Sequence, residues 1–167
     1  MQRMIRYIAV AGLSGLFAGN ALLARAQTVE LVTKAEKEIE VVEKGAKFKK
    51  LSPPLKMVPG DEVLYTVTYS NKTAKPAETV AVTNPVPKFT RYIDNSAAGD
   101  GATITFSVDG GKTFATPDKL IVALKDKSGK DTTRSAVASD YTHIRWVLKQ
   151  NVAPGQSGSV RFRAAIL

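Results

Sequence analysis

Residues 58–84 read VPGDEVLYTVTYSN, KTAKPAE and TVAVTN. Pro59 and Gly60 signal a turn, because proline presets its own φ and glycine accepts conformations that other residues avoid. The next residues alternate strictly between two faces, one of which carries Val63, Tyr65, Val67 and Tyr69. A polar, proline-containing loop over 71–78 precedes a second alternating run at 79–83. Two β-rich strands joined by a polar loop predict the start of an antiparallel β-sandwich.

The rest of the chain continues this pattern of short strands separated by turn signals. Alternation predicts strands over 28–34, 35–44, 103–108, 113–115, 120–124, 142–148 and 158–167. The basic segment 46–56 contains Pro53 and Pro54 and is therefore expected to form an edge segment. A glycine-rich turn at 109–112 is expected to join two strands, and 125–133 to form a charged loop. The fold class predicted is an all-β, immunoglobulin-like antiparallel β-sandwich of about eight or nine strands with Greek-key connections.

The core is expected to centre on Trp146, the only tryptophan of the chain. Alternation turns Ile144 and Leu148 to the same side as Trp146, and it turns Phe162 inward on the last strand. The apolar residues that follow the second strand of the opening stretch are expected to cover one open end of the core: Phe89, Tyr92 and Ile93.

The first 26 residues have the features of a secretory signal peptide. Arg3 and Arg6 precede an apolar run over 7–23, and Ala24-Arg25-Ala26 has the small-x-small pattern of a cleavage site before Gln27. Residues 27–167 are then a single domain of an exported protein, in the periplasm or outside the cell or on its surface. The alternative is an uncleaved membrane anchor. No later stretch is long and apolar enough to span a bilayer.

Composition limits the chemistry of the chain. There is no cysteine, which excludes disulfides, thiolate metal sites and a cysteine nucleophile. The 24 Lys and Arg residues outnumber the 15 Asp and Glu residues, giving a formal net charge of +9. A basic surface favours anionic partners such as lipopolysaccharide or acidic glycans; the alternative is that the charge only keeps the domain soluble. No nucleic-acid partner and no cofactor are expected.

Three groups of polar residues contain residue types used in catalysis or metal binding, and each is interpreted as structural. His143 is the only histidine, and it is expected to be an exposed strand residue rather than part of a Ser-His-Asp site with Ser139 and Asp140. Residues 107–114 match the Asp box of sialidase-type propellers, here interpreted as a hairpin turn stabilised by its aspartate. Asp94, Asp100 and Asp109 lack the clustered spacing of a calcium loop. No catalytic or metal residue is predicted.

Two interaction hypotheses follow from the strands. If 142–148 and 158–166 form a hairpin, then Arg145, Arg161 and Arg163 share its outer face, and this arginine face is a candidate site for a polyanion. Alternatively, acidic neighbours or spread side chains relieve the electrostatic repulsion among the three arginines. Separately, the alternating segment 28–44 is a candidate for exchange between subunits in a fibre or dimer. The alternative there is that the segment pairs within its own domain.

Several ordered motifs resemble the bacterial conserved-repeat domain of unknown function. They are V-P-G-D-E-V-x-Y-T-V-T-Y-S-N at 58–71, P-A-E-T-V-A-V-T-N-P-V-P at 76–87, F-S-V-D-G-G-K-T-F at 106–114, D-Y-T-H-I-R-W at 140–146 and A-P-G-Q-S-G-S-V-R-F-R-A at 153–164. The resemblance implies an immunoglobulin-like module of exported envelope and surface proteins, often present in tandem, whereas this chain has one copy. It implies fold and location, and no chemistry. We therefore expect a non-enzymatic structural or interaction module of the bacterial cell envelope, or alternatively a self-assembling subunit that uses strand addition through 28–44.

Overall fold

The computed structural model describes residues 29–167, and within them the chain forms antiparallel strands and two single-turn 3₁₀ segments. The predicted signal peptide, 1–26, lies outside the described residues. The strands are β1 (Val29–Glu43), β2 (Ala46–Ser52), β3 (Glu62–Asn71), β4 (Ala81–Pro85), β5 (Thr90–Tyr92), β6 (Ala102–Ser107), β7 (Ile121–Lys125), β8 (Asp131–Ser135), β9 (His143–Leu148) and β10 (Ser157–Ile166). The 3₁₀ turns are η1 (Pro117–Lys119) and η2 (Ala138–Asp140).

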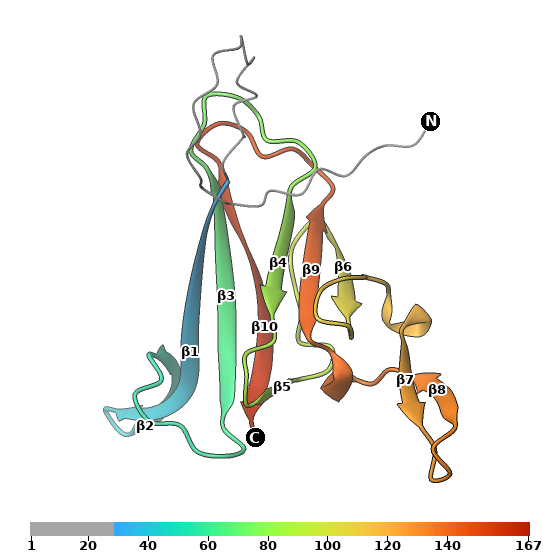
Figure 1. Cartoon of the computed structure of the whole chain (residues 1–167). Helices are drawn as coiled ribbons and strands as arrows, with labels where there is room; N and C mark the ends of the chain where they lie inside the picture. The colour runs from blue at the N-terminus through green and yellow to red at the C-terminus, as the bar shows by residue number, and fades with distance from the viewer. Residues whose placement is uncertain (1–28) are drawn as a thin grey trace, which may run out of the picture.

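Two sheets pack face to face and enclose the core (Figure 1). One sheet has the order β2-β1-β3-β10-β5, and the other has the order β4-β9-β6. Trp146 of β9 and Phe162 of β10 are both fully buried, and their ring centroids lie 6.1 Å apart across the interface between the sheets. The predicted all-β antiparallel sandwich is therefore confirmed, with Trp146 in its core.

The two strands of the opening stretch belong to opposite sheets. β3 lies between β1 and β10, whereas β4 pairs with β9. The polar loop between them carries the chain across the sandwich, and the fully buried Asn71 fixes its start. The Asn71 amide donates hydrogen bonds to the carbonyl oxygens of Lys75 (2.7 Å) and Val152 (2.8 Å). A buried polar side chain therefore holds the crossing between the sheets.

The turn predicted from Pro59 and Gly60 leads into β3. Gly60 has a φ of +90°, and the Asp61 N–H donates to the Val58 carbonyl oxygen at 3.0 Å. The Val58 N–H in turn donates to the Asp61 carboxylate at 2.9 Å. Glycine is needed at this position because other residues rarely adopt a positive φ.

Some details differ from the sequence predictions, among them the two strands predicted over 28–34 and 35–44, which form the single strand β1 within the described residues. Residues 46–52 form β2 at the edge of the larger sheet, as expected for an edge segment within 46–56, whereas 131–135 form the paired strand β8 although the sequence predicts a loop over 125–133. Both are exposed ribbon strands, which need cross-strand hydrogen bonds but no apolar alternation. Residues 113–115 make only an isolated bridge, between Ala115 and Phe106. Phe89 is 82% exposed, so it does not cover the core; Tyr92 does, at 5.3 Å from Phe106 between ring centroids.

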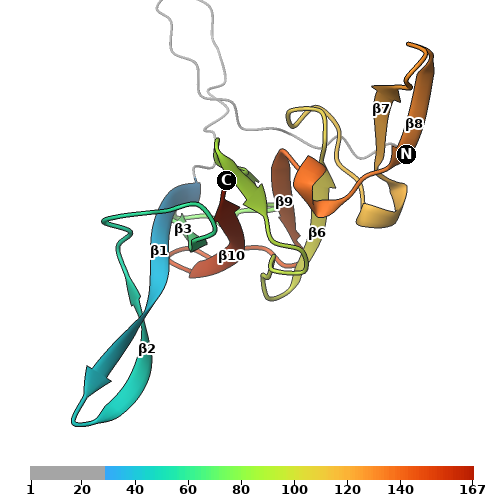
Figure 2. The same cartoon turned by 90° about the horizontal axis from the view of Figure 1, so that it is seen from below.

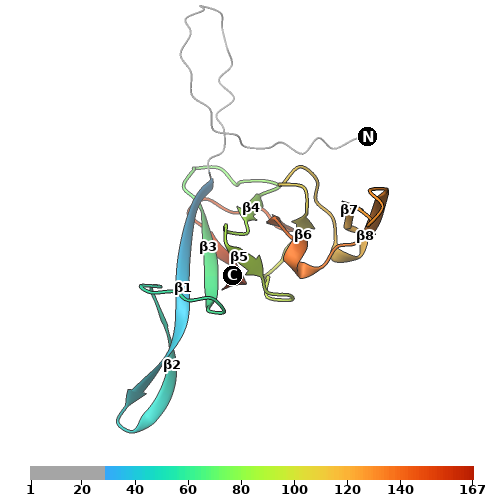
Figure 3. The ribbon, with the colours of Figure 1, turned by 60° about the horizontal axis from the view of Figure 1, so that its bottom comes forward.

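Two ribbons project from opposite sides of the sandwich (Figures 2 and 3). The first is formed by the distal part of β1 with β2, and the second by β7 with β8. We call residues 38–51 the arm, since they extend beyond the last pairing of β1 with β3 at Lys37 and Val63.

Candidate interaction site

The three arginines of the predicted polyanion face do not lie on one face. The prediction required 142–148 and 158–166 to form a hairpin. They do not, because β9 and β10 belong to opposite sheets. Arg145 therefore lies on the outer face of the three-stranded sheet, whereas Arg161 and Arg163 lie on the outer face of the five-stranded sheet. Sequence alternation gives the face of a residue within its strand, but it does not give the sheet that the strand joins.

Neighbouring side chains contact two of these arginines. The Arg163 guanidinium lies 3.7 Å from both Glu38 and Glu62. Arg145 donates from Nε to the Thr83 hydroxyl at 3.1 Å, and its guanidinium carbon lies 3.5 Å from the centre of the Phe114 ring. The alternative interpretation, in which neighbours relieve the repulsion, thus applies to Arg163. Polyanion binding itself stays a prediction.

His143 packs on the turn that follows β6. Its Nδ1 lies 3.2 Å from the Thr142 hydroxyl, and a Cβ placed on Gly111 would lie 3.3 Å from its ring. In the same turn, the Ser107 hydroxyl donates to Asp109 at 2.6 Å. Asp140, the acid considered near His143, forms a bidentate pair with Arg134 at 2.6 and 2.8 Å. These contacts give each side chain a structural role.

Asp109 organises the turn of the Asp-box motif. Its carboxylate accepts hydrogen bonds from the Ser107 hydroxyl, the Lys112 and Thr113 N–H groups and the Thr113 hydroxyl. These donors, led by Ser107 and Thr113, hold the pKa of the Asp109 carboxyl well below its usual range. The structural interpretation of the motif as a stabilised turn is therefore confirmed.

The described residues offer little enclosed space. Two hollows, of about 170 and 140 Å³, meet at Asp100 on the side of the sandwich. Pockets for small ligands are usually about 300–1,000 Å³. Over 29–167, no three His, Cys, Asp or Glu side chains are grouped closely enough to hold a metal ion, and Asp94, Asp100 and Asp109 form no such group.

The first half of β1 forms an exposed edge of the larger sheet. β3 pairs with 29–37 on one side of β1, and β2 pairs with 37–43 on the other. Among the described residues, 29–36 therefore have a neighbouring strand on one side only, and we call this segment the open edge. Two apolar side chains of the open edge are solvent-exposed, Leu31 by 47% and Val32 by 57%. Exposed edges of this kind are templates for pairing with another chain.

The arm continues the sheet beyond the open edge and is held by ion pairs. Glu40 pairs with Lys47 and Glu38 with Lys49, each at 2.7 Å. At the base of the arm, Lys37 contacts Asp61 at 2.6 Å, which lowers the pKa of the Asp61 carboxyl. The arm also exposes large apolar side chains: Val42, Phe48 and Leu51.

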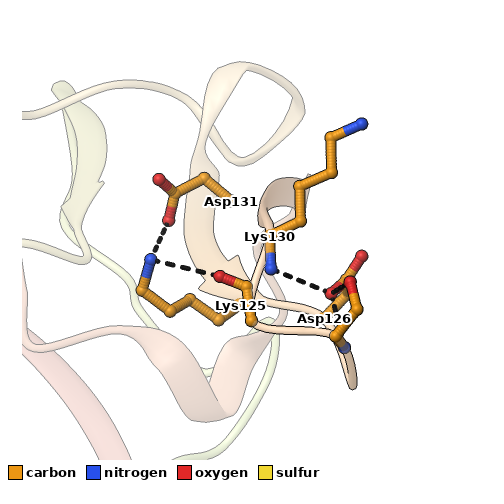
Figure 4. Close-up of polar contacts among 6 residues, drawn as sticks. Lys125, Asp126, Lys130 and Asp131 are labelled. Atoms are coloured by element: carbon orange, nitrogen blue, oxygen red, sulfur yellow. Dashed lines mark hydrogen bonds and ion pairs between the residues drawn. The ribbon is translucent and has the colours of Figure 1, made fainter.

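The β7–β8 ribbon is the second projection, and its ends are fixed by polar contacts. At its tip, Lys125 contacts Asp131 at 2.6 Å, and the Lys130 N–H donates to Asp126 (Figure 4). At its base, the pair of Arg134 with Asp140 lowers the pKa of Asp140 to about 2. The sequence signal that could have revealed this ribbon is Asp126 with Gly129, which form the turn between β7 and β8.

No family model matches this chain, and neither the curated proteins nor the solved structures include one that is similar to it. No helix within residues 29–167 has the length and apolar character needed to cross a membrane. The resemblance to the conserved-repeat domain therefore stays a prediction.

Proposed function

We propose that this chain is an exported, non-enzymatic interaction or structural module of the bacterial cell envelope. The signal-peptide pattern of 1–26 and the motif resemblance support the location. The contacts of His143, Ser107 and Asp109 support a structural use of the polar residues, since each takes part in forming the turn after β6.

The observation that carries the proposal is the projecting arm together with the adjoining open edge. Phe48 is 52% exposed and Val42 is 64% exposed, on a ribbon that the second sheet does not cover. Large apolar side chains exposed to water on an extended element have an unfavourable free energy of hydration, and a binding partner that covers them removes it. Backbone groups along the open edge that pair with no other described strand add hydrogen-bonding capacity for an incoming strand.

Export is tested by expressing the full chain in a bacterium and fractionating the cells. We expect the protein in the periplasmic, surface or extracellular fraction, with Gln27 as its first residue. Recovery of an intact chain from the cytoplasm would contradict the exported location.

Interaction through the arm is tested by placing a photo-crosslinking amino acid at Phe48 in intact cells. The matched control carries the same group at Lys149, which is exposed in the loop after β9. We expect adducts from position 48 that contain an envelope component and that are absent from position 149. Equal yields from the two positions would argue against the arm as an interaction site.

The alternative function is a self-assembling subunit that uses strand addition through 28–44. The open edge favours it, since it lies inside this segment and has backbone groups directed away from β3. In the crosslinking experiment, adducts that contain only this chain would favour self-assembly, whereas adducts with another envelope component would favour the module.

A further inference from the structure

We propose that two copies of this chain pair edge to edge through the open edge of β1, antiparallel and about a two-fold axis at Val32. This inference rests on the self-assembly alternative of the proposed function, and it names the partner and the register. The partner is a second copy because the sequence of the open edge complements itself.

Symmetry limits the possible registers. Antiparallel strands related by a two-fold axis keep the same sheet face on the same side, so residues that face each other must both be inner or both outer. In β1 the inner positions are Val29, Leu31, Thr33 and Ala35, which oppose Asn71, Tyr69, Val67 and Tyr65 of β3. The axis must therefore lie midway between two copies of one residue of the open edge, so that this residue is paired with itself.

Three registers use most of the open edge, and the pairing of charges separates them. An axis at Thr33 places Glu30 opposite Glu36, and an axis at Leu31 places Glu30 opposite Val32. An axis at Val32 places Glu30 opposite Lys34 twice and Val32 opposite itself. Opposite charges directly across two strands stabilise the pairing, and like charges destabilise it. The Val32 register is the best match of the three.

The same register agrees with exposure and with available length. Val32, 57% exposed in one molecule, would be covered by its symmetry mate, and Leu31 would face Thr33 on the inner side. Residues 29–35 of one copy pair with residues 35–29 of the other. This pairing ends before Lys37, because from Lys37 onward each β1 is already paired on that side with β2 of its own molecule. The seven-residue match therefore fits the gap that β2 leaves.

Existing ion pairs of the open edge do not prevent the pairing. Lys34 contacts Glu36 at 2.8 Å, and Glu30 lies 3.9 Å from Lys72. The Glu30–Lys72 pair is exposed on both sides and contributes little to stability. Glu36 is only 12% exposed, but its partner Lys34 is 65% exposed, so Glu30 and Lys34 can both turn toward a neighbouring strand. The result is one sheet that runs through both molecules, in which the two β1 strands are adjacent.

A charge-reversal experiment tests the register on the chain from Gln27 onward, which contains every described strand. Analytical ultracentrifugation over a wide concentration range would compare the unmodified chain with Glu30→Lys and with Lys34→Glu. Each variant replaces two Glu–Lys pairs by two like-charge pairs, so we expect at least about tenfold weaker dimerisation. Mixing the two variants restores complementary pairs at both positions, so we expect a heterodimer to form.

Matched controls separate this effect from a change in net charge. Glu78→Lys and Lys88→Glu make the same charge changes at exposed positions outside the larger sheet. We expect each control variant to dimerise like the unmodified chain. If the control variants weaken dimerisation as much as the edge variants do, the proposed register is wrong.

A cysteine variant tests the axis directly, because the chain has no cysteine of its own. Residues directly opposite across two antiparallel strands have Cα atoms about 4.5–5.5 Å apart, within the range that a disulfide spans, so we expect Val32→Cys to form a disulfide-linked dimer under mild oxidation. The control is Thr68→Cys on β3, in the same row as Val32. The two Thr68 positions would lie about three strand spacings apart, roughly 14 Å, which is too far for a disulfide.

The outcomes separate this inference from the proposed function. A chain that is monomeric at all concentrations, or a dimer unaffected at Glu30 and Lys34, overturns the register. Photo-crosslinking from Phe48 to another envelope component would then still support the interaction module. A dimer that is lost when the arm is deleted, but keeps its strength in both edge variants, points to exchange of the arm and overturns the edge pairing.

Discussion

Trp146 is fully buried between the sheets, and its Nε1 has no hydrogen-bond partner within the described residues. Its contribution to the stability of the fold therefore comes from packing against residues such as Phe162. The sequence indicated this role, because a single tryptophan lay in an alternating strand. It could not indicate the unpaired nitrogen, which depends on groups from distant segments.

We predict that Trp146→Ala lowers the free energy of unfolding by about 3–5 kcal/mol, the usual cost of removing a buried large aromatic side chain. Trp146→Phe should cost clearly less, since it keeps most of the ring and breaks no hydrogen bond. Urea unfolding followed by circular dichroism measures both. Equal losses for the two variants would contradict a role based on packing alone.

Asp140 gives a pH prediction at the same scale. Arg134 lowers the folded-state pKa of Asp140 to about 2, below the value of about 3.9 in unfolded chains. A carboxyl with a lowered folded pKa adds stability above its unfolded pKa and loses that contribution as the pH falls through its folded pKa. We therefore expect the stability of the unmodified chain to fall between about pH 4 and pH 2.

Asp140→Asn should flatten this dependence, because the amide has no proton to gain in that interval. Unfolding measured at several pH values tests this prediction, with Glu78→Gln as the control for an exposed acid. An unchanged pH profile in Asp140→Asn would show that other carboxyls produce the loss of stability in acid.

At the scale of the element, alternation identified the strands that carry the core. Inward residues of β3, β9 and β10 followed their sequence pattern, as Val67, Ile144 and Phe162 show. The exposed strand β8 was not identified and β2 was expected only as an edge segment, because their pairing rests on backbone hydrogen bonds and exposed ion pairs. A buried strand needs apolar residues at alternate positions, so the sequence pattern predicts it, whereas an exposed paired strand needs no such pattern.

The arm is expected to open more readily than the sandwich. Isolated two-stranded ribbons are marginally stable in water, and neither β3 nor the second sheet covers 38–51. Hydrogen exchange at low protein concentration should therefore be much faster for arm amides than for those of β3 and β10. Arm amides as protected as that of Val67 would indicate that a partner covers the arm.

At the scale of the whole molecule, the assignment of strands to sheets could not be obtained from local sequence. β9 and β10 follow each other in the chain, and their faces were predicted correctly within each strand. The hairpin considered for them would have placed three arginines together, but the chain crosses the sandwich between them. Crossing depends on long-range contacts, such as the bridge of Ala77 with Val152.

This arrangement predicts how the arginines contribute to any binding of a polyanion. Arg161 and Arg163 share a face, so Arg161→Gln/Arg163→Gln should weaken binding of lipopolysaccharide. Arg145→Gln should leave the affinity unchanged, because Arg145 lies on the opposite side of the molecule and stacks on Phe114. Binding measured at several salt concentrations tests this. An equal loss from both variants would contradict a binding site on one face.

The partial cover of β1 by β2 also has a consequence for the size of an assembly. A symmetric pairing at Val32 would occupy the open edge in both molecules, so growth through this edge would end at two chains. The opposite edge of the sheet is β5, whose three residues offer little for propagation. Head-to-tail addition would instead leave a fresh edge at every step and produce filaments. The length of β2 would thus determine which residues of β1 can pair with a second copy and also how many chains the assembly contains.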